Sequence, residues 1–299
     1  MRRVFTVFAF VLTLLLSINA YAAERLIEAT GRYVMDSRLG ETTAAATERA
    51  REDAKRAAAM KAGVYLESYS KTVNLELTED EVQMVASRLL KIQDEKSDVK
   101  VVDGHLLQFN VTITAIVDDV DEAALKSIMT NKQNLSAMTK NYKELQAKYD
   151  ALNRQMEEYR KGYDKASDKA LLKEKVRKNS EEFNAALKAK EGLTHYYAGN
   201  INEALASYDA AIKLNPRFAE AYNNRGVIYY SQNKFAEAVA DYTLAVNFRA
   251  NYADAYYNRA IAYGALKNYP MAKADLEAAL RINPNDADAA ELYRKLQNY

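Results

Sequence analysis

The chain has 299 residues, which is room for two or three modules. Its 42 Lys and Arg residues balance its 41 Asp and Glu residues, so no basic excess indicates a nucleic-acid partner. The absence of Cys excludes disulfides, thiolate metal sites, a Cys nucleophile and lipid attachment through an N-terminal Cys. Only three Pro residues interrupt a composition rich in Ala, Lys, Glu and Leu, which predicts a mostly helical chain.

Residues 1–22 have the pattern of a cleaved signal peptide. Arg2 and Arg3 precede an apolar run over residues 4–18, and the small residues around Ala22 form a cleavage site. The apolar run is shorter than the ~20 residues that a membrane-spanning helix needs. We therefore expect export across the inner membrane, cleavage after Ala22 and a periplasmic protein without an integral membrane span. The alternative is an uncleaved N-terminal anchor.

Residues 23–121 have the pattern of a small α+β domain. A candidate strand covers residues 26–35, and an Ala-rich helix covers residues 44–63. A second helix over residues 78–90 begins with a capping box, because Thr78 is followed three residues later by Glu81.

A hairpin completes this domain. Its strands cover residues 99–102 and 107–117 and flank the turn pair Asp103-Gly104. In the last strand apolar residues alternate with polar ones, so one face is buried and the other is wet. The order β-α-α-β-β predicts an antiparallel sheet with helices on one side.

Three segments of this domain resemble a bacterial envelope domain. They are AREDAKRAAAMKAGVYLES from residue 50, LTEDEV from residue 77 and AIVD from residue 115. Over residues 26–118 the chain is similar to the N-terminal domain of flagellar assembly protein T and to related small secreted lipoproteins. The resemblance implies a structural or assembly role. Lipid anchoring does not carry over, because those lipoproteins use a Cys.

Residues 122–178 form a predicted helical linker with a heptad pattern. Over residues 128–166 one seam contains Ile128, Leu135, Tyr142, Tyr149, Met156 and Tyr163, and the other contains Met138, Leu145, Leu152, Tyr159 and Ala166. A sustained heptad period predicts a coiled coil and hence a homo-oligomer. The alternative is a long amphipathic helix that folds back on its own chain.

Self-similarity at a fixed spacing dominates the C-terminal part. Residues 185–218, 219–252 and 253–286 align without a gap as three units of equal length. Their common length is the period of a helix-turn-helix repeat of about 34 residues. Small residues recur at places 8, 20 and 27 of each unit and large residues at place 24, namely Gly192, Gly226, Ala260, Ala204, Ala238, Ala272, Ala211, Ala245, Ala279, Tyr208, Tyr242 and Leu276. The pattern resembles the tetratricopeptide repeat (TPR) family. This resemblance implies an all-α solenoid over residues 179–298, with residues 287–297 as a capping helix.

Two pairs of opposite charges recur at one spacing in the second and third units. Arg225 and Arg259 stand at place 7, and Asp241 and Asp275 stand at place 23 of the same units. We expect each Arg to pair with its Asp across the helical hairpin, as a stabilising contact.

No group of residues suggests catalysis, a metal site or a cofactor. His105 follows a turn and His195 occupies an aromatic place of the first unit, so the two histidines are expected in different domains. No Gly-rich phosphate loop is present. The protein is therefore predicted not to be an enzyme.

The repeat resemblance implies a groove that binds a peptide. In the family, the first helix of each unit lines a concave face, mainly through places 2, 5, 6, 9 and 12. The candidate residues are Leu193, Tyr196, Glu220, Asn223, Asn224, Val227, Tyr230, Tyr257, Asn258 and Ile261, and Gly264 stands at place 12 of the third unit. Of the clamp with which chaperone-binding relatives hold two carboxylates, only Asn224 matches, so a Glu-Glu-Val-Asp tail is not an expected ligand.

Asn224 and Asn258 occupy place 6 in successive units. We expect both to face solvent on the concave side, where their carboxamides can bind a peptide main chain, since each offers a donor and an acceptor. The alternative is that both bond only to neighbouring helices.

Together these features predict a periplasmic adaptor that binds a peptide segment of an envelope protein. One alternative is a purely structural oligomeric envelope protein whose groove is filled by its own chain. A less favoured alternative is a glycan-binding subunit that uses some of the 22 Tyr residues.

Overall fold

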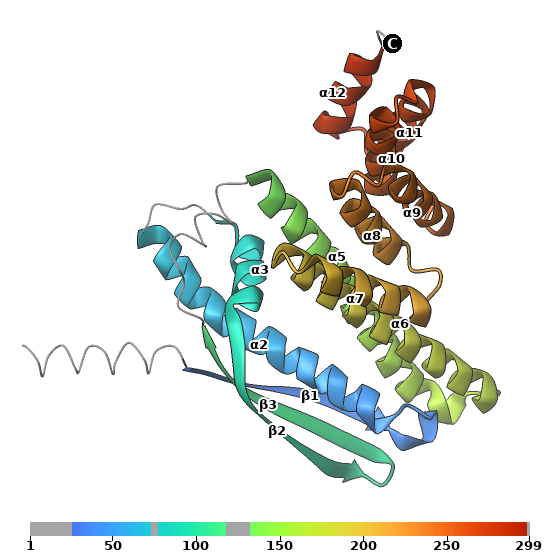
Figure 1. Cartoon of the computed structure of the whole chain (residues 1–299). Coiled ribbons are helices and arrows are strands. Elements are labelled where there is room, and N and C mark those ends of the chain that lie inside the picture. Colours follow the sequence, from blue (N-terminus) through green and yellow to red (C-terminus); the bar gives the residue numbers. More distant parts are fainter. Residues whose placement is uncertain (1–25, 73–76, 118–131, 298–299) are drawn as a thin grey trace, which may run out of the picture. The chain divides into compact units, whose positions relative to one another are not determined.

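The computed structural model describes residues 26–72, 77–117 and 132–297 (Figure 1). It contains two compact bodies. The first consists of the residues up to 146 together with 154–177, and the second consists of 147–153 together with the residues from 178 onwards. The predicted signal peptide lies outside the described residues. Among the described residues, none of the helices combines the length and the apolar composition of a membrane span.

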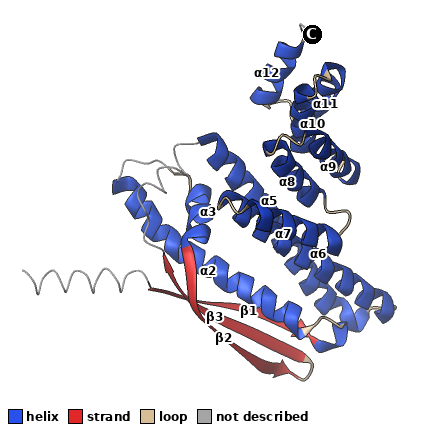
Figure 2. Cartoon of the chain, viewed as in Figure 1, coloured by secondary structure: helices blue, strands red, loops and turns tan. Residues whose placement is uncertain are grey.

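The first body has the predicted order β-α-α-β-β, and the α+β fold of this part is confirmed. Its elements are β1 (Leu26–Asp36), the short helix η1 (Ser37–Leu39), α2 (Thr43–Thr72), α3 (Glu79–Leu89), β2 (Leu90–Asp103) and β3 (Leu106–Val117). The three strands form an antiparallel sheet in the order β1-β3-β2 (Figure 2). The capping box of α3 is present: the Thr78 hydroxyl accepts from the Glu81 amide, and the Glu81 carboxylate accepts from the Thr78 amide.

Helix α2 packs closely on β1 because small residues meet at the contact. Ala50 and Ala54 of α2 are fully buried, and a Cβ on Gly31 of β1 would overlap their backbone atoms. The Arg32 amide of β1 also donates to the Asp53 carboxylate of α2 at 3.0 Å. The Ala-rich face of α2 and Gly31 therefore bring the two backbones together.

Two predicted boundaries in the first body were wrong. Helix α2 continues past Gly63 to Thr72, and Gly63 is not a helix stop but a packing site: a Cβ there would lie 2.9 Å from Gln83 Nε2 of α3. Strand β2 begins at Leu90 rather than at residue 99. Residues 93–98 of this strand are all polar and so carry no apolar alternation, because an exposed edge strand needs only backbone pairing with β3.

The heptad seam of α5 (Lys132–Gly162) packs within the same chain. In the first body Met156 and Tyr163 cluster with Leu39 and with Val176 of α6 (Lys169–Tyr197). In the second body Tyr149 and Leu152 cluster with Phe183 of α6. Asn179 of α6 also donates to the Leu152 backbone oxygen, and Tyr149 contacts Phe183, so α5 and α6 are antiparallel at these residues.

This packing has two consequences for the predicted coiled coil. The helix ends at Gly162 rather than continuing to residue 166. The seam positions just named meet the chain's own α6, as the intramolecular alternative requires. Self-association through residues 128–166 stays a prediction.

The second body continues with pairs of antiparallel helices at a constant spacing. After α6 come α7 (Ile201–Leu214), α8 (Ala219–Ser231), α9 (Phe235–Phe248), α10 (Ala253–Ala265), α11 (Tyr269–Ile282) and α12 (Ala287–Leu296). Helices α7, α9 and α11 begin at equal intervals along the chain, and α8, α10 and α12 begin at the same interval. The solenoid architecture is confirmed.

The small residue at place 8 makes room for the large residue at place 24. A Cβ on Gly192 would lie 2.9 Å from the Tyr208 ring, and a Cβ on Gly226 would lie 2.7 Å from the Tyr242 ring. The third unit has Ala260 with the smaller Leu276 at these places, and both are buried. The glycines thus accommodate the rings that fill each hairpin.

Both predicted Arg–Asp pairs are confirmed. Arg225 donates two hydrogen bonds to Asp241 at 2.8 and 2.7 Å, and Arg259 donates two to Asp275 at 2.7 Å each. Each Arg also reaches the preceding unit: Arg225 contacts Asp209 at 2.6 Å, and Arg259 donates to Thr243 at 3.1 Å. The pairs therefore join successive units as well as the two helices of one hairpin.

Candidate functional site

The predicted concave places extend into the last helix. Because α12 begins one repeat period after α10, it stands where a fourth unit would place its first helix. Its places 2, 5, 6 and 9 are Asp288, Glu291, Leu292 and Lys295. Helix α12 is therefore both a cap and a further concave helix, a role that the sequence analysis missed although counting the period one unit further reveals it.

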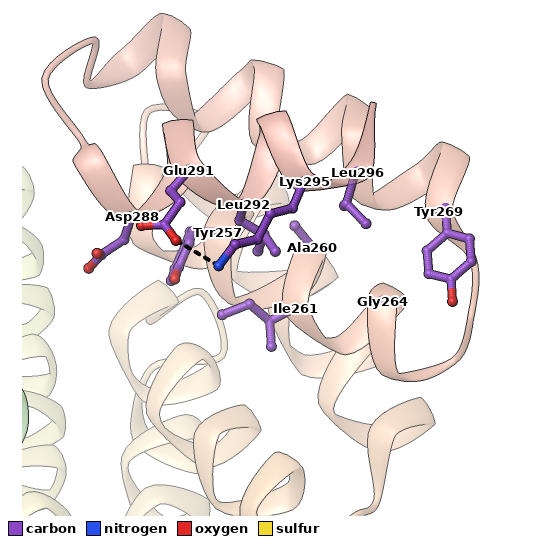
Figure 3. Close-up of a pocket in the computed structure, with 10 residues that line it drawn as sticks. All are labelled: Tyr257, Ala260, Ile261, Gly264, Tyr269, Asp288, Glu291, Leu292, Lys295 and Leu296. Carbon is purple, nitrogen blue, oxygen red and sulfur yellow. Dashed lines mark ion pairs between the residues drawn. The ribbon is translucent and has the colours of Figure 1, made fainter. Parts of the chain in front are cut away.

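A pocket of about 550 Å³ lies between α10 and α12 (Figure 3). From α10 it includes the predicted groove residues Tyr257 and Ile261 together with Gly264. The full lining is Tyr257, Ala260, Ile261, Gly264, Tyr269, Asp288, Glu291, Leu292, Lys295 and Leu296. The structure thus brings places 5, 9 and 12 of the third unit together around one cavity.

Gly264 helps to keep this pocket open. No atom lies within 4 Å of the position that a Cβ on Gly264 would take, and its backbone is not in the left-handed region. The glycine is therefore not needed for a turn or a close helix contact. A side chain at this position would project into free space of the pocket.

The pocket combines apolar walls with an acidic rim. Ile261, Leu292 and Leu296 supply hydrocarbon surface, while Asp288 and Glu291 stand on α12 (Figure 3). Lys295 forms an ion pair with Glu291 at 2.6 Å, which leaves the rim one negative charge in excess. The hydrogen bond from Lys295 lowers the pKa of Glu291, so this carboxyl is ionised at neutral pH.

Tyr257 remains a neutral hydroxyl in this setting. Its burial raises its pKa, and the negative charges of Asp288, Asp286 and Glu291 raise it further. The pocket therefore presents neutral and apolar groups inside and negative charge outside. This arrangement favours an apolar side chain that has a basic neighbour.

The corresponding places of the second unit are filled by the chain itself. Asn223 and Asn224 are only 3% and 7% exposed. Asn258 donates to the Asn223 side-chain oxygen at 2.9 Å, Asn223 donates to the Asn224 oxygen at 3.3 Å, and a further hydrogen bond joins Asn224 to Tyr208. The expectation that Asn224 faces solvent was wrong, because its carboxamide belongs to this buried ladder between helices.

Glu220, at place 2 of the second unit, is also engaged within the chain. Its carboxylate contacts Arg249 at 3.3 Å and Lys148 at 3.8 Å. The Lys148 ammonium also lies 4.1 Å from the centre of the Phe218 ring. These contacts hold the start of α8 and leave Glu220 8% exposed.

The remaining predicted groove residues have mixed roles. Leu193 is buried, and Tyr196 is half-buried with its ring 5.1 Å from that of Tyr197. Val227 and Tyr230 pack on a cluster of buried residues that includes Tyr242. Of the ten predicted groove residues, only Tyr257 and Ile261 line the pocket.

Comparisons with known proteins agree with this repeat geometry. Models of the tetratricopeptide repeat match residues 189–256 and 253–286. No curated protein sequence matches the chain.

Similar solved structures include the first TPR of Spaghetti (RPAP3) bound to an HSP90 peptide, with 30% identity, a TM-score of 0.38 and coverage of 38% of this chain and 91% of that chain. The Arabidopsis OM64 TPR domain has 28% identity, a TM-score of 0.38 and coverage of 40% and 98%. The TPR2B domain of yeast Sti1, in a complex with pHsp70, has 28% identity, a TM-score of 0.36 and coverage of 38% and 97%. From the constant helix spacing and the matched family models, residues 189–286 of this chain are tetratricopeptide repeats.

Proposed function

We propose that this protein is a non-catalytic adaptor that binds a short peptide segment of a partner protein in the pocket between α10 and α12. The observation that carries the proposal is the open, apolar pocket at repeated concave places, beside a second-unit surface whose side chains are already bonded to each other. Repeat solenoids commonly use their concave surfaces for binding. The bound segment presents an apolar side chain to Ile261 and Leu292.

The acidic rim adds a charge preference to this proposal. Asp288 and the Glu291–Lys295 pair leave a net negative charge around the entrance. A Lys or Arg next to the apolar anchor would lie near Asp288 and gain a charge-assisted contact. The proposed ligand is therefore a peptide with an apolar residue flanked by a basic one.

Selection from a random displayed peptide library tests this function. On the wild-type protein, we expect enriched peptides that share an apolar residue with Lys or Arg within two positions. On an Asp288→Lys variant with an unchanged circular dichroism spectrum, the flanking preference should shift towards Asp or Glu. No enrichment on the wild-type protein, or the same charge preference on both proteins, would contradict the proposal.

We also propose that the protein acts outside the cytoplasm, in assembly of the bacterial cell envelope. The support is the targeting pattern of residues 1–22 and the resemblance of residues 26–118 to envelope assembly domains. N-terminal sequencing of the protein from its host should give Ala-Glu-Arg-Leu, starting at Ala23. A protein that retains Met1 would contradict cleavage after Ala22.

A further inference from the structure

Strand β2 is an exposed edge of the sheet in the first body. It pairs with β3 on one side, and no strand among the described residues pairs with its other side (Figure 2). All of its residues after Leu90 are exposed, although the facing residues of β3 are mostly buried or half-buried. A long edge strand presents unpaired backbone groups that can bind another strand.

The two faces of β2 differ in chemistry. Asp94, Lys96, Asp98 and Lys100 lie opposite Thr114, Thr112, Asn110 and Gln108 of β3, on the polar face of the sheet. Their charges alternate along one row. Within the row, Lys96 lies 3.5 Å from Asp94 and Lys100 lies 3.8 Å from Asp98.

On the face that α2 covers elsewhere, β2 carries apolar residues without cover. Val99 and Val101 lie opposite Phe109 and Leu107 of β3. Phe109 is 3% exposed, whereas Val99 and Val101 are 53% and 70% exposed. The apolar layer under α2 therefore continues onto β2 and ends at an open edge.

We propose that β2 pairs with β2 of a second copy of this chain, antiparallel and centred on Ser97. In a two-fold pair of identical antiparallel strands, the residue on the axis lies opposite itself. With Ser97 on the axis, Asp94 lies opposite the partner's Lys100, and Lys96 lies opposite the partner's Asp98. By symmetry this gives four pairs of opposite charge and none of like charge among these residues.

Neighbouring registers are disfavoured by the same charges. Centring the pair on Lys96 would place Lys96 opposite itself and Asp94 opposite the partner's Asp98. Centring it on Asp98 would place two Asp residues opposite each other and Lys96 opposite the partner's Lys100. Opposite charges in directly facing positions stabilise strand pairing and like charges destabilise it. Because only the register centred on Ser97 places all four charged residues of the row opposite a residue of the other sign, the charge row favours that register.

The other face is compatible with this register. Val99 lies opposite the partner's Glu95. In each copy the Glu95 carboxylate is held by Arg51 of α2 at 2.7 Å, which leaves the Glu95 methylene groups to cover Val99. The result is a six-stranded antiparallel sheet in which both α2 helices lie on the same face.

Disulfide trapping tests the register directly, because the natural chain has no Cys. In the proposed pair the two Ser97 Cα atoms lie about 4.5–5.5 Å apart, a separation that a disulfide bridges. A Ser97→Cys variant should therefore form a covalent dimer on mild oxidation. A Val99→Cys variant is the matched control: its two thiols would be about 13 Å apart along the strands, so it should stay largely monomeric on a denaturing gel.

Charge exchange tests the partner and the contacts. Light scattering should show a dimer for the purified wild-type protein and a monomer for Lys96→Asp/Lys100→Asp and for Asp94→Lys/Asp98→Lys. A mixture of these two variants should form a dimer with one copy of each. A variant with all four charges inverted should dimerise like the wild type.

The exposed positions make loss of folding an unsuitable explanation, and circular dichroism of each variant checks this. A wild-type protein that is monomeric up to about 100 μM, where a pair with a micromolar Kd would be mostly dimeric, would overturn the proposal. So would a dimer that persists in Lys96→Asp/Lys100→Asp, or one in which Val99→Cys crosslinks as efficiently as Ser97→Cys. The last two results would place the contact between copies on another surface or in another register.

Discussion

The two ends of the concave face use equivalent repeat places differently. In the second unit, places 5 and 6 are Asn223 and Asn224, which are buried and hydrogen bonded to neighbouring helices. In the third unit, place 5 is Tyr257, which lines an open pocket with Ile261 at place 9. The helix that follows each unit accounts for part of the contrast: Asn258 of α10 bonds to Asn223, whereas α12 presents Leu292 and leaves space.

This contrast shows that a repeat place does not by itself determine a role in binding. The same place is structural where the next helix supplies a polar partner and accessible where it does not. Gly264 strengthens the difference, because place 12 carries Tyr230 in the second unit and no side chain in the third. The contrast also indicates which substitutions should affect binding and which should affect stability.

The largest expected effect is on binding at the open end. Gly264→Leu places a side chain in free space of the pocket and should weaken binding of a selected peptide about 100-fold, or about 2.7 kcal/mol. Titration calorimetry measures this change. Ala265→Leu, at the neighbouring exposed position of α10, is the control and should bind normally. Equal affinities of the two variants would show that the peptide lies elsewhere.

The ionic frame is common to both ends, and its loss should affect stability. Arg225→Leu leaves Asp241, which is 4% exposed, without its bidentate partner and should reduce the free energy of unfolding by about 2 kcal/mol. Chemical denaturation measures this change. The double variant Arg225→Leu/Asp241→Leu should recover part of the loss, because no buried charge remains. A fully additive double variant would contradict a direct pair.

The deficit of Arg225→Leu should also depend on pH. Burial already raises the pKa of Asp241 in the wild type, despite the opposing effect of Arg225. Without the guanidinium this pKa rises further above that of the unfolded chain. The folded variant then binds the proton more tightly than the wild type does. The deficit should therefore shrink as the pH falls from the raised Asp241 pKa of the variant towards the Asp241 pKa of the wild type. Denaturation at pH 8 and pH 5 tests the direction, and a deficit that grows at pH 5 would contradict it.

A smaller effect is expected from the closed end. Asn223→Ala removes the acceptor of Asn258 and the donor to Asn224, and should lower the free energy of unfolding by about 1.5 kcal/mol. Its affinity for a pocket-binding peptide should stay within about twofold of the wild type, a change below about 0.5 kcal/mol. A stable variant that loses peptide binding would instead assign Asn223 to the ligand site.

The smallest effect concerns the turns that join the helices of each unit. Place 15 has a positive φ in all three units: 79° at Gly199, 60° at Asn233 and 59° at Lys267. A left-handed backbone costs a residue such as Lys about 1 kcal/mol, so Lys267→Gly should raise the unfolding free energy by up to that amount. Asn233→Gly should gain less, because Asn tolerates this conformation. Thermal denaturation distinguishes the two, and a destabilised Lys267→Gly would contradict the reason given.

The sequence alone predicted those features that local spacing determines. The repeat period, the small residues at place 8 and the spacing of each Arg from its Asp depend on one chain segment, and the structure contains all of them. Two predictions failed where a neighbouring element decides the outcome. Gly63 was interpreted as a helix end because its contact with α3 is not visible in the sequence. Asn224 was expected to face solvent because its hydrogen bond with Tyr208 of the preceding helix is not visible in the sequence.

The pocket itself combines both kinds of information. Tyr257 and Ile261 followed from their places in the third unit. The opposite wall follows only if the period is counted one unit further, to Asp288 and Lys295 in α12. Whether that wall closes on α10 or leaves a cavity depends on side-chain volumes at Leu292 and Gly264, which a repeat pattern does not specify.

Methyl NMR of a selected peptide with the isotopically labelled protein tests most directly where the partner binds. We expect the Ile261, Leu292 and Leu296 methyl signals to shift on titration, because these side chains line the pocket. The signal of Ile228, which is fully buried in the second repeat, should stay in place. Shifts confined to the second repeat or to the first body, with Ile261 and Leu292 unchanged, would contradict binding in the pocket between α10 and α12.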